Sequence, residues 1–210
     1  MIKAIVFDMD GVLIEAKEWH YEALNRALEL FGMKISRHDH LSTYDGLPTK
    51  RKLELLSLET DLPTGLHDFI NEMKQQYTTD IIHAQCRPTF CHEYALARLK
   101  ADGYRLGLAS NSVRRTVELM MEKAHLSAYL DVTLSNQDVA RGKPDPEIYL
   151  LAMNRLGVRA EECLVVEDNP NGVRAARDAG AHVLVVKEVT EVNYANLSAA
   201  IARANEELAS

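Results

Sequence analysis

Two carboxylates, Asp8 and Asp10, directly follow an apolar run at the start of this 210-residue chain. An ionised carboxylate that is buried without a partner is costly, so these acids require a cation, hydrogen-bond donors or water. Residues i and i+2 of an extended chain project to the same side, which lets both acids face one site. Gly11 then allows a sharp turn or a close approach of the backbone to a ligand. The pair indicates a binding site, with a solvated acidic turn as the alternative.

Three further polar clusters add a hydroxyl, an amide, a lysine and more acids: Ser110-Asn111-Ser112, Gly142-Lys143-Pro144-Asp145 and Glu167-Asp168-Asn169. Several carboxylates together bind Mg²⁺, which prefers oxygen ligands. Lysine and Ser/Asn donors balance the charge on phosphoryl oxygens, where positioning and electrostatics carry most of the catalysis. One aspartate can attack phosphorus to give an acyl phosphate, and a second carboxyl group can protonate the departing oxygen. The set therefore suits phosphoryl transfer.

The elements around these clusters predict an α/β fold with a Rossmann-like parallel sheet flanked by helices. Strand-like apolar runs occur at residues 2–7, 105–109, 131–135, 163–166 and 182–186. Helical patterns occur at 90–102, 113–124, 146–156, 172–178 and 197–208. Strands that alternate with helices imply right-handed crossovers and a mostly parallel sheet. Ligands bind beyond the carboxyl ends of such strands, which is where the four polar clusters fall.

A helical block interrupts the chain after the first strand. Residues 15–31, 47–58 and 65–76 carry apolar side chains at helical intervals, without strand-like alternation. We therefore predict a helical cap domain at 15–84, inserted into a discontinuous α/β catalytic core that consists of residues 1–14 and 85–210.

Composition narrows the classes of function. The hydrophobic content of 47% and charged content of 26% are ordinary for a globular protein. A net charge of −7 argues against a nucleic-acid binder, and no apolar run approaches the ~20 residues that span a bilayer. The N-terminus lacks the pattern of an export signal, and three cysteines without metal-ligand spacing indicate reduced thiols. We expect a cytoplasmic monomer or weak homodimer that binds neither nucleic acid nor membranes.

The four polar clusters, in this order, resemble the four motifs of the haloacid dehalogenase superfamily. The resemblance runs from Asp8-Met9-Asp10-Gly11-Val12-Leu13 to Glu167-Asp168-Asn169-Pro170-Asn171-Gly172 and covers essentially the whole chain. With its helical cap after the first motif, the chain is similar to the branch that contains phosphoglycolate phosphatase-like and β-phosphoglucomutase-like enzymes.

The resemblance implies a role for each motif residue. Asp8 would be the nucleophile and Asp10 the general acid/base, while phosphate would be held by Ser110, Lys143 and Asn111. Mg²⁺ would be ligated by the side chain of Asp8, the backbone carbonyl of Asp10 and Asp168, with Glu167 acting through water or orienting the shell. Two further motif residues, Ser112 and Asn169, also suit helix N-caps.

Asp10 argues against the dehalogenases themselves, because they need no second aspartate to protonate a phosphate-ester leaving group. Trp19-His20 and the segment Gly46–Arg51 resemble sugar-phosphate mutases. However, Ala16 replaces a mutase threonine and Thr49 replaces the arginine for a second phosphate. We therefore favour a Mg²⁺-dependent phosphatase for a small phosphorylated metabolite such as a sugar phosphate. The alternatives are a β-phosphoglucomutase-like phosphomutase and a non-catalytic binding protein of the same fold.

Cap residues are expected to select the substrate. His20 is expected either to contact substrate or orient the acid/base group, or to be a buried structural residue. Tyr44 and Lys50 are further candidates for substrate contact. His38 and His40 flank Asp39, and we expect a solvated polar loop there, with a metal site as the alternative.

Overall fold

The computed structural model describes residues 1–208 and divides the chain into two compact units. The α/β unit combines Met1–Glu15 with the chain from Arg87 onward, and the helical unit is Ala16–Cys86.

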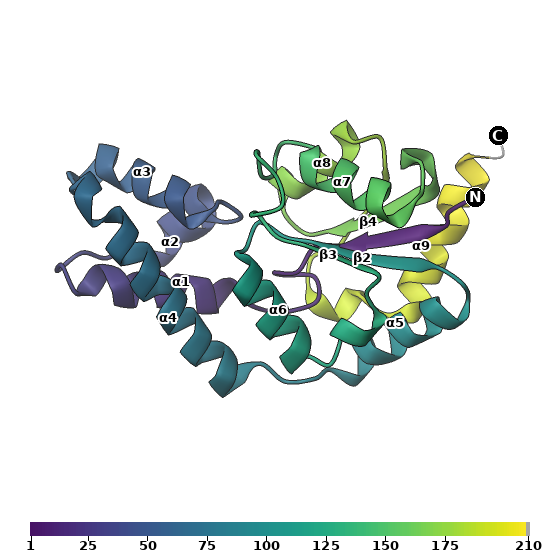
Figure 1. The fold of residues 1–210 in the computed structure, drawn as a ribbon, viewed down its shortest axis with the longest axis horizontal. Coiled ribbons are helices and arrows are strands. Elements are labelled where there is room, and N and C mark those ends of the chain that lie inside the picture. The colour runs from purple at the N-terminus through teal and green to yellow at the C-terminus, as the bar shows by residue number, and fades with distance from the viewer. Residues whose placement is uncertain (209–210) are drawn as a thin grey trace. The chain divides into compact units, whose positions relative to one another are not determined.

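The α/β unit contains a five-stranded parallel sheet in the order β3-β2-β1-β4-β5, which confirms the predicted fold class (Figure 1). Its strands are β1 (Ala4–Phe7), β2 (Arg105–Ala109), β3 (Val132–Leu134), β4 (Cys163–Glu167) and β5 (His182–Val185). The first strand lies between β2 and β4, with Phe7 paired to Leu108 on one side and to Val166 on the other. All four β1 residues are fully buried, as expected for a parallel strand covered on both faces. The carboxyl ends of β1, β2 and β4 therefore lie side by side.

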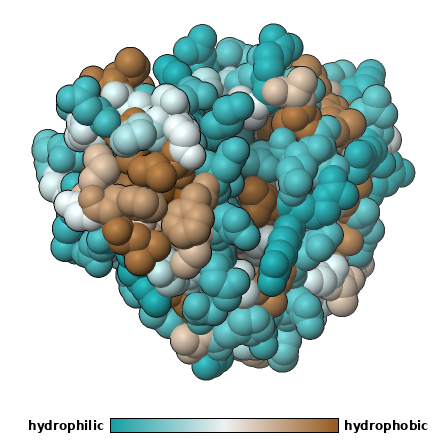
Figure 2. Space-filling model, turned by 60° about the vertical axis from the view of Figure 1, so that its left-hand side comes forward, coloured by the Kyte–Doolittle hydropathy of each residue, from teal (hydrophilic) through white to brown (hydrophobic). Residues whose placement is uncertain are grey.

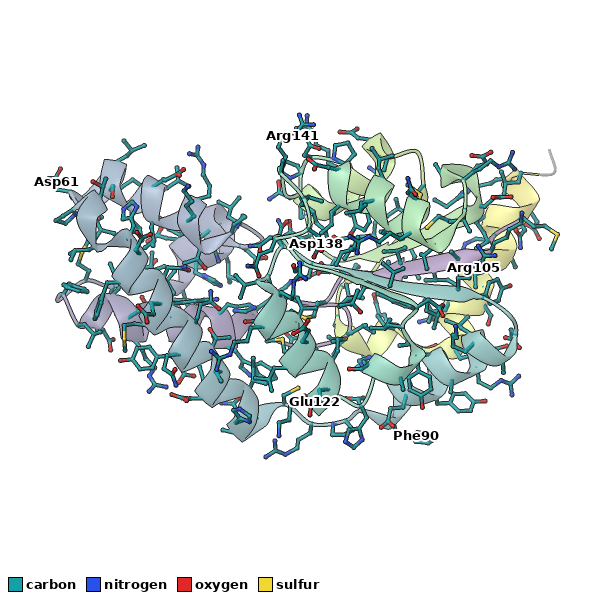
Figure 3. The ribbon with its side chains drawn as sticks, in the orientation of Figure 1. Asp61, Phe90, Arg105, Glu122, Asp138 and Arg141 are labelled. Atoms are coloured by element: carbon teal, nitrogen blue, oxygen red, sulfur yellow. The ribbon has the colours of Figure 1, made fainter. Side chains whose placement is uncertain are left out.

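Helices cover both faces of this sheet (Figure 1). On one face lie α7 (Glu147–Leu156) and α8 (Pro170–Asp178), and on the other α5 (Phe90–Ala101), α6 (Arg114–Lys123) and α9 (Tyr194–Glu207). Gly157 ends α7 with a left-handed φ of 64°. The guanidinium of Arg105, labelled in Figure 3, donates to the carbonyls of Leu156 and Gly157, which ties the end of α7 to the start of β2.

The helical unit consists of three longer helices and three short helical segments, of which the last is η2 (Thr64–Leu66). The longer helices are α1 (Lys17–Glu29), α3 (Thr49–Thr60) and α4 (His67–Gln85), and α1 packs along α4. Leu24, Leu28, Leu53 and Ile70 form part of its core. Helix α4 continues nine residues past the predicted end because Thr78, Ile81 and Ile82 extend its buried face.

The prediction of a solvated loop around His38 and His40 is wrong for His40. This segment forms α2 (Arg37–Asp39), followed by one turn of π-helix, η1 (His40–Tyr44). Ser36 begins α2 as its N-cap, accepting a hydrogen bond from the backbone N–H of Asp39 at 3.1 Å. His38 is exposed, whereas only 1% of the surface of His40 is accessible. The segment formed by α2 and η1 thus buries His40 and leaves His38 exposed to solvent.

Apolar and polar side chains both reach the surface, as the brown and teal areas of Figure 2 show. The exposed apolar residues of the helical unit include Leu30, Phe31 and Phe69, and the last two meet edge to face with ring centroids 5.9 Å apart. The oligomeric state stays a prediction. Among residues 1–208, no helix is both long enough and apolar enough to cross a membrane.

Candidate active site

A compact turn fixes Asp8 and Asp10 at the end of β1. The N–H of Asp8 donates to the carbonyl of Val166 at 3.0 Å, which keeps this residue in register with β4. The carbonyl of Met9 then accepts hydrogen bonds from Leu13 and Ile14 at 3.0 and 2.9 Å, closing the turn. Gly11 adopts a φ of 86°, a conformation that favours glycine. The acids are therefore held by backbone geometry.

Lys143 lies between two carboxylates that come from different strands. Its Nζ is 2.6 Å from Oδ1 of Asp8 and 2.6 Å from Oε1 of Glu167. The hydroxyl of Tyr149 donates to the same Oε1 at 2.7 Å, and the ammonium lies 4.7 Å from the centroid of the tyrosine ring. All four side chains are nearly inaccessible to solvent. This Asp8–Lys143–Glu167–Tyr149 set is the buried network of the site.

Each oxygen of the Glu167 carboxylate accepts two hydrogen bonds. Its second oxygen, Oε2, accepts hydrogen bonds from the backbone N–H groups of Asp168 and Asn169 at 3.0 and 3.2 Å. Gly172, in the first turn of α8, lies so close that a Cβ there would meet Oε1 at 1.7 Å. A glycine is therefore required at position 172 if Glu167 is to keep its contacts.

The second and third motifs are joined through Asn111. Its Oδ1 accepts from the N–H of Lys143 at 3.0 Å, and its Nδ2 donates to the carbonyl of Lys143 at 3.2 Å. A Cβ on Gly142 would lie 2.7 Å from that Oδ1, so the close approach needs glycine. The side-chain amide that was expected to contact phosphate thus orients the backbone of Lys143, and a phosphate contact from Asn111 stays a prediction.

Two serines of the second motif are engaged locally. Oγ of the buried Ser110 accepts from the N–H of Ser112 at 3.0 Å, and Oγ of Ser112 donates to Oδ2 of Asp10 at 3.0 Å. The expectation that Ser112 caps a helix is wrong, since Val113 is the N-cap of α6. The expectation for Asn169 is confirmed, because it caps α8 and accepts from the N–H of Asn171.

The site carries more negative than positive charge. Burial raises the pKa of Asp8 well above its ordinary value; Glu167 and Asp10 add to this, and Lys143 offsets it only in part. Burial alone would lower the pKa of Lys143, but Asp8 and Glu167 raise it overall, so the lysine stays protonated. One carboxylate oxygen each from Asp8, Glu167 and Asp168 lie within 4.8 Å of one another. This oxygen cluster, with its unbalanced charge, fits a hard divalent cation such as Mg²⁺.

Three residues with predicted substrate roles lie in the helical unit. His20 on α1 accepts a hydrogen bond from Lys74 on α4, with Nδ1 and Nζ 3.1 Å apart. Tyr44 is buried in the helical core and donates to Glu59 at 2.6 Å; burial and Glu59 both raise its pKa. Lys50 is exposed at the start of α3. Substrate contacts from these three residues stay predictions.

Sequence reasoning missed Tyr149 and the structural role of Gly172. A tyrosine at position 149 fits a buried helix face, and only the proximity of Glu167 gives its hydroxyl a role. The sequence signal for Gly172 was a glycine in the first turn of a helix, because alanine stabilises a helix by about 1 kcal/mol relative to glycine.

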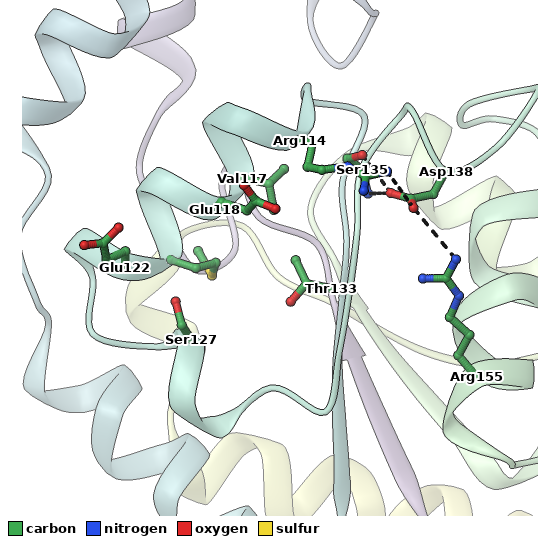
Figure 4. A pocket seen from close by; sticks show the side chains of 10 residues that line it. Arg114, Val117, Glu118, Glu122, Ser127, Thr133, Ser135, Asp138 and Arg155 are labelled. Carbon is green, nitrogen blue, oxygen red and sulfur yellow. Dashed lines mark hydrogen bonds and ion pairs between the residues drawn. The ribbon is translucent and has the colours of Figure 1, made fainter.

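A separate pocket lies beside α6 and β3, in the same α/β unit (Figure 4). Its volume is about 460 Å³, and its walls include Val117, Met121 and Thr133. Charged residues also line the pocket. Nη2 of Arg114 lies 3.0 Å from Oδ1 of Asp138, and Nη2 of Arg155 lies 3.8 Å from the same oxygen. The residues that line it include no member of the buried network, so we place the candidate active site at the carboxyl ends of β1, β2 and β4.

Comparison with known proteins identifies the family. The family model described as haloacid dehalogenase-like hydrolase matches residues 5–186. A phosphorylated carbohydrates phosphatase from Thermotoga maritima is 32% identical over 182 residues, which cover 85% of this chain and 82% of that protein. The crystal structure of CbbY from Rhodobacter sphaeroides in complex with phosphate is 28% identical, with a TM-score of 0.78, and the match covers 88% of this chain and 86% of CbbY. A β-phosphoglucomutase from Clostridium difficile has the same fold, with a TM-score of 0.84 at 22% identity over 100% of both chains. The resemblance inferred from the four motifs is confirmed, and the chain belongs to the haloacid dehalogenase-like hydrolase family.

Proposed function

We propose that this protein is a Mg²⁺-dependent phosphatase that hydrolyses a small phosphomonoester, such as a sugar phosphate, through an aspartyl-phosphate on Asp8. The observation that carries the proposal is Lys143 held 2.6 Å from both Asp8 and Glu167, with Asp168 completing the acidic cluster. An ammonium beside a buried aspartate can balance phosphoryl charge at the point where the aspartate attacks.

Catalysis would proceed in two steps. A carboxylate oxygen of Asp8 attacks phosphorus, the ester P–O bond breaks, and Asp10 gives a proton to the departing oxygen. Asp10 then takes a proton from water, the water oxygen attacks phosphorus, and the bond between phosphorus and Asp8 breaks to release phosphate. The hydrogen bond from Ser112 holds Asp10 in position for both proton transfers.

The phosphate would be held by Ser110 and Lys143. Mg²⁺ would be held by Asp8, Asp168 and the backbone carbonyl of Asp10, with Glu167 ordering the surroundings through its four hydrogen bonds. The chemistry supplied by bound Mg²⁺ is neutralisation of the charge on the phosphoryl oxygens.

Hydrolysis is favoured over a phosphomutase reaction by two residues of the helical unit. Ala16 and Thr49 stand where the sugar-phosphate mutases that the chain resembles carry threonine and arginine. The phosphatase named among the relatives, from Thermotoga maritima, agrees with this choice. The Trp19-His20 pair keeps a phosphomutase as the second candidate.

The test is to measure phosphate release from p-nitrophenyl phosphate and a panel of sugar phosphates, with MgCl₂ and with EDTA. We expect turnover with Mg²⁺, its loss with EDTA, and its loss in Asp8→Asn with an unchanged circular dichroism spectrum. Full activity of Asp8→Asn would exclude Asp8 as the nucleophile. Isomer formation with little phosphate release would favour the mutase, and Mg²⁺ binding without any turnover would favour a binding protein.

A further inference from the structure

Tyr149 brings a neutral hydrogen-bond donor into the buried network. It lies on α7 and is fully buried, and its hydroxyl donates to Oε1 of Glu167 at 2.7 Å. A phenol has a single hydrogen to donate, so this bond uses the whole donor capacity of the side chain. The acceptor belongs to the acidic cluster of Asp8, Glu167 and Asp168. The hydroxyl therefore acts on the site through Glu167.

Four donors fill the acceptor sites of the Glu167 carboxylate. Each carboxylate oxygen offers a pair of lone-pair sites. Oε1 accepts from Lys143 and Tyr149 at 2.6 and 2.7 Å, and Oε2 accepts from the backbone N–H groups of Asp168 and Asn169 at 3.0 and 3.2 Å. One oxygen of Glu167 lies within 4.8 Å of oxygens of Asp8 and Asp168, close enough to share a cation with them. A direct bond from Glu167 to that cation would nevertheless displace one of the four donors.

No other donor of this group can replace the Tyr149 hydroxyl. The two backbone N–H groups lie at the start of α8, where Asn169 is the N-cap, and both already bind Oε2. The ammonium of Lys143 is divided between Oε1 of Glu167 and Oδ1 of Asp8, both at 2.6 Å. Its N–H groups diverge, so it cannot aim two hydrogens at one oxygen. Loss of the hydroxyl would therefore leave one acceptor site of Oε1 open within the acidic cluster.

The number of carboxylates that bind directly matters for the choice of cation. Mg²⁺ demands near-octahedral geometry, keeps several waters and usually binds few carboxylates, whereas Ca²⁺ takes more oxygen ligands in a flexible geometry. In the proposed function, Asp8 and Asp168 are the side chains that hold Mg²⁺. A further direct carboxylate from Glu167 would make the site more suitable for Ca²⁺.

We propose that Tyr149 is a positioning residue that sets the cation selectivity of the site. Its hydroxyl keeps Oε1 of Glu167 occupied, so Glu167 orders the site without ligating the cation, and Mg²⁺ is favoured over Ca²⁺. The sequence left open whether Glu167 acts through water or orients its surroundings, and the four hydrogen bonds favour the second role. The inference rests on the proposed function for the Mg²⁺ site itself.

The test measures the binding of MgCl₂ and of CaCl₂ to the metal-free full chain by isothermal titration calorimetry. The readout is the ratio of the two dissociation constants, because a general loosening of the fold weakens the binding of both cations alike. We expect Tyr149→Phe to shift this ratio towards Ca²⁺ by about 10-fold or more, the size of effect typical of groups that surround metal ligands. If Tyr149→Phe does not fold, Tyr149→Met also removes the hydroxyl and takes its place.

Tyr194→Phe is the matched control. The hydroxyl of Tyr194 also donates to a carboxylate, that of Asp102 at 2.6 Å, but this hydrogen bond is exposed to solvent. Both residues belong to the α/β unit, and neither is part of the buried network. We expect the ratio of dissociation constants in Tyr194→Phe to equal that of wild type.

The outcomes separate this inference from the proposed phosphatase activity. The same ratio in wild type, Tyr149→Phe and Tyr194→Phe would refute the role of Tyr149, whether or not the wild type releases phosphate. A wild type that prefers Mg²⁺ but releases no phosphate would refute the phosphatase, and a shift towards Ca²⁺ in Tyr149→Phe would still support the inference. A wild type that binds neither cation would overturn both proposals.

Discussion

Gly172→Ala adds one methyl group beside Glu167, and its cost follows from the contacts of that carboxylate. The new Cβ would lie 1.7 Å from Oε1, 2.1 Å from Cδ and 2.5 Å from Oε2, well inside van der Waals contact. The backbone of α8 cannot easily retreat, since Asn169 anchors its first turn. The side chain of Glu167 must therefore leave its position.

Moving Glu167 breaks four hydrogen bonds at once. Two come from Lys143 and Tyr149 at 2.6 and 2.7 Å, and two come from backbone N–H groups at 3.0 and 3.2 Å. Breaking a buried ion pair by removal of one partner costs about 3–5 kcal/mol. In an open helix, by contrast, alanine is better than glycine by about 1 kcal/mol. We expect Gly172→Ala to lower the free energy of unfolding by about 3–5 kcal/mol and to abolish phosphatase activity.

The assay is urea denaturation of the full chain, followed by circular dichroism. Gly65→Ala is the matched control, because nothing lies within 4 Å of the position that its Cβ would take. We expect this control to stay within about 0.5 kcal/mol of wild type, as surface substitutions usually do. A Gly172→Ala variant as stable as Gly65→Ala would refute the fixed position of Glu167.

Two further predictions concern buried groups. Tyr149→Phe removes one hydrogen bond to the ionised Glu167 and keeps the ring beside Lys143, so the free energy of unfolding should fall by about 1.5–3 kcal/mol in the same urea assay. An unchanged urea midpoint would mean that the Tyr149 hydroxyl contributes nothing to the free energy of unfolding. The pKa of His40 is about 4 in the folded protein, so the imidazole stays neutral there until the pH falls to that range. In the unfolded chain it takes up a proton near pH 6.5, its ordinary pKa. Stability should therefore fall as the pH is lowered from 6.5 towards 4, and fall less in His40→Gln. Parallel stability–pH curves for the two proteins would contradict this reasoning.

The sequence predicted the sheet and the position of its polar clusters because each cluster follows an apolar run, and parallel strands bring such ends together. The partners within the site were harder to predict. Asn111 and Lys143 are separated by 31 residues of chain that have no sequence pattern linking them. The three basic residues at positions 50–52 are chemically similar, and only the rotation of α3 about its axis buries Lys52 beside the core residue Leu53. Tertiary packing determines which side of α3 faces the core, and the sequence pattern of this helix did not predict that side.

The central place of β1 in the sheet has a consequence for synthesis on the ribosome. Ala4 pairs with Arg105 and Cys163, so β1, the first strand to be made, waits about 100 residues for β2 and about 160 residues for β4. The helical unit, which ends at Cys86, is complete before that point. Asp8 meets Lys143 and Glu167 only when four-fifths of the chain has emerged. Truncated or stalled chains that end before Lys143 therefore carry the acidic pair without the lysine that balances it.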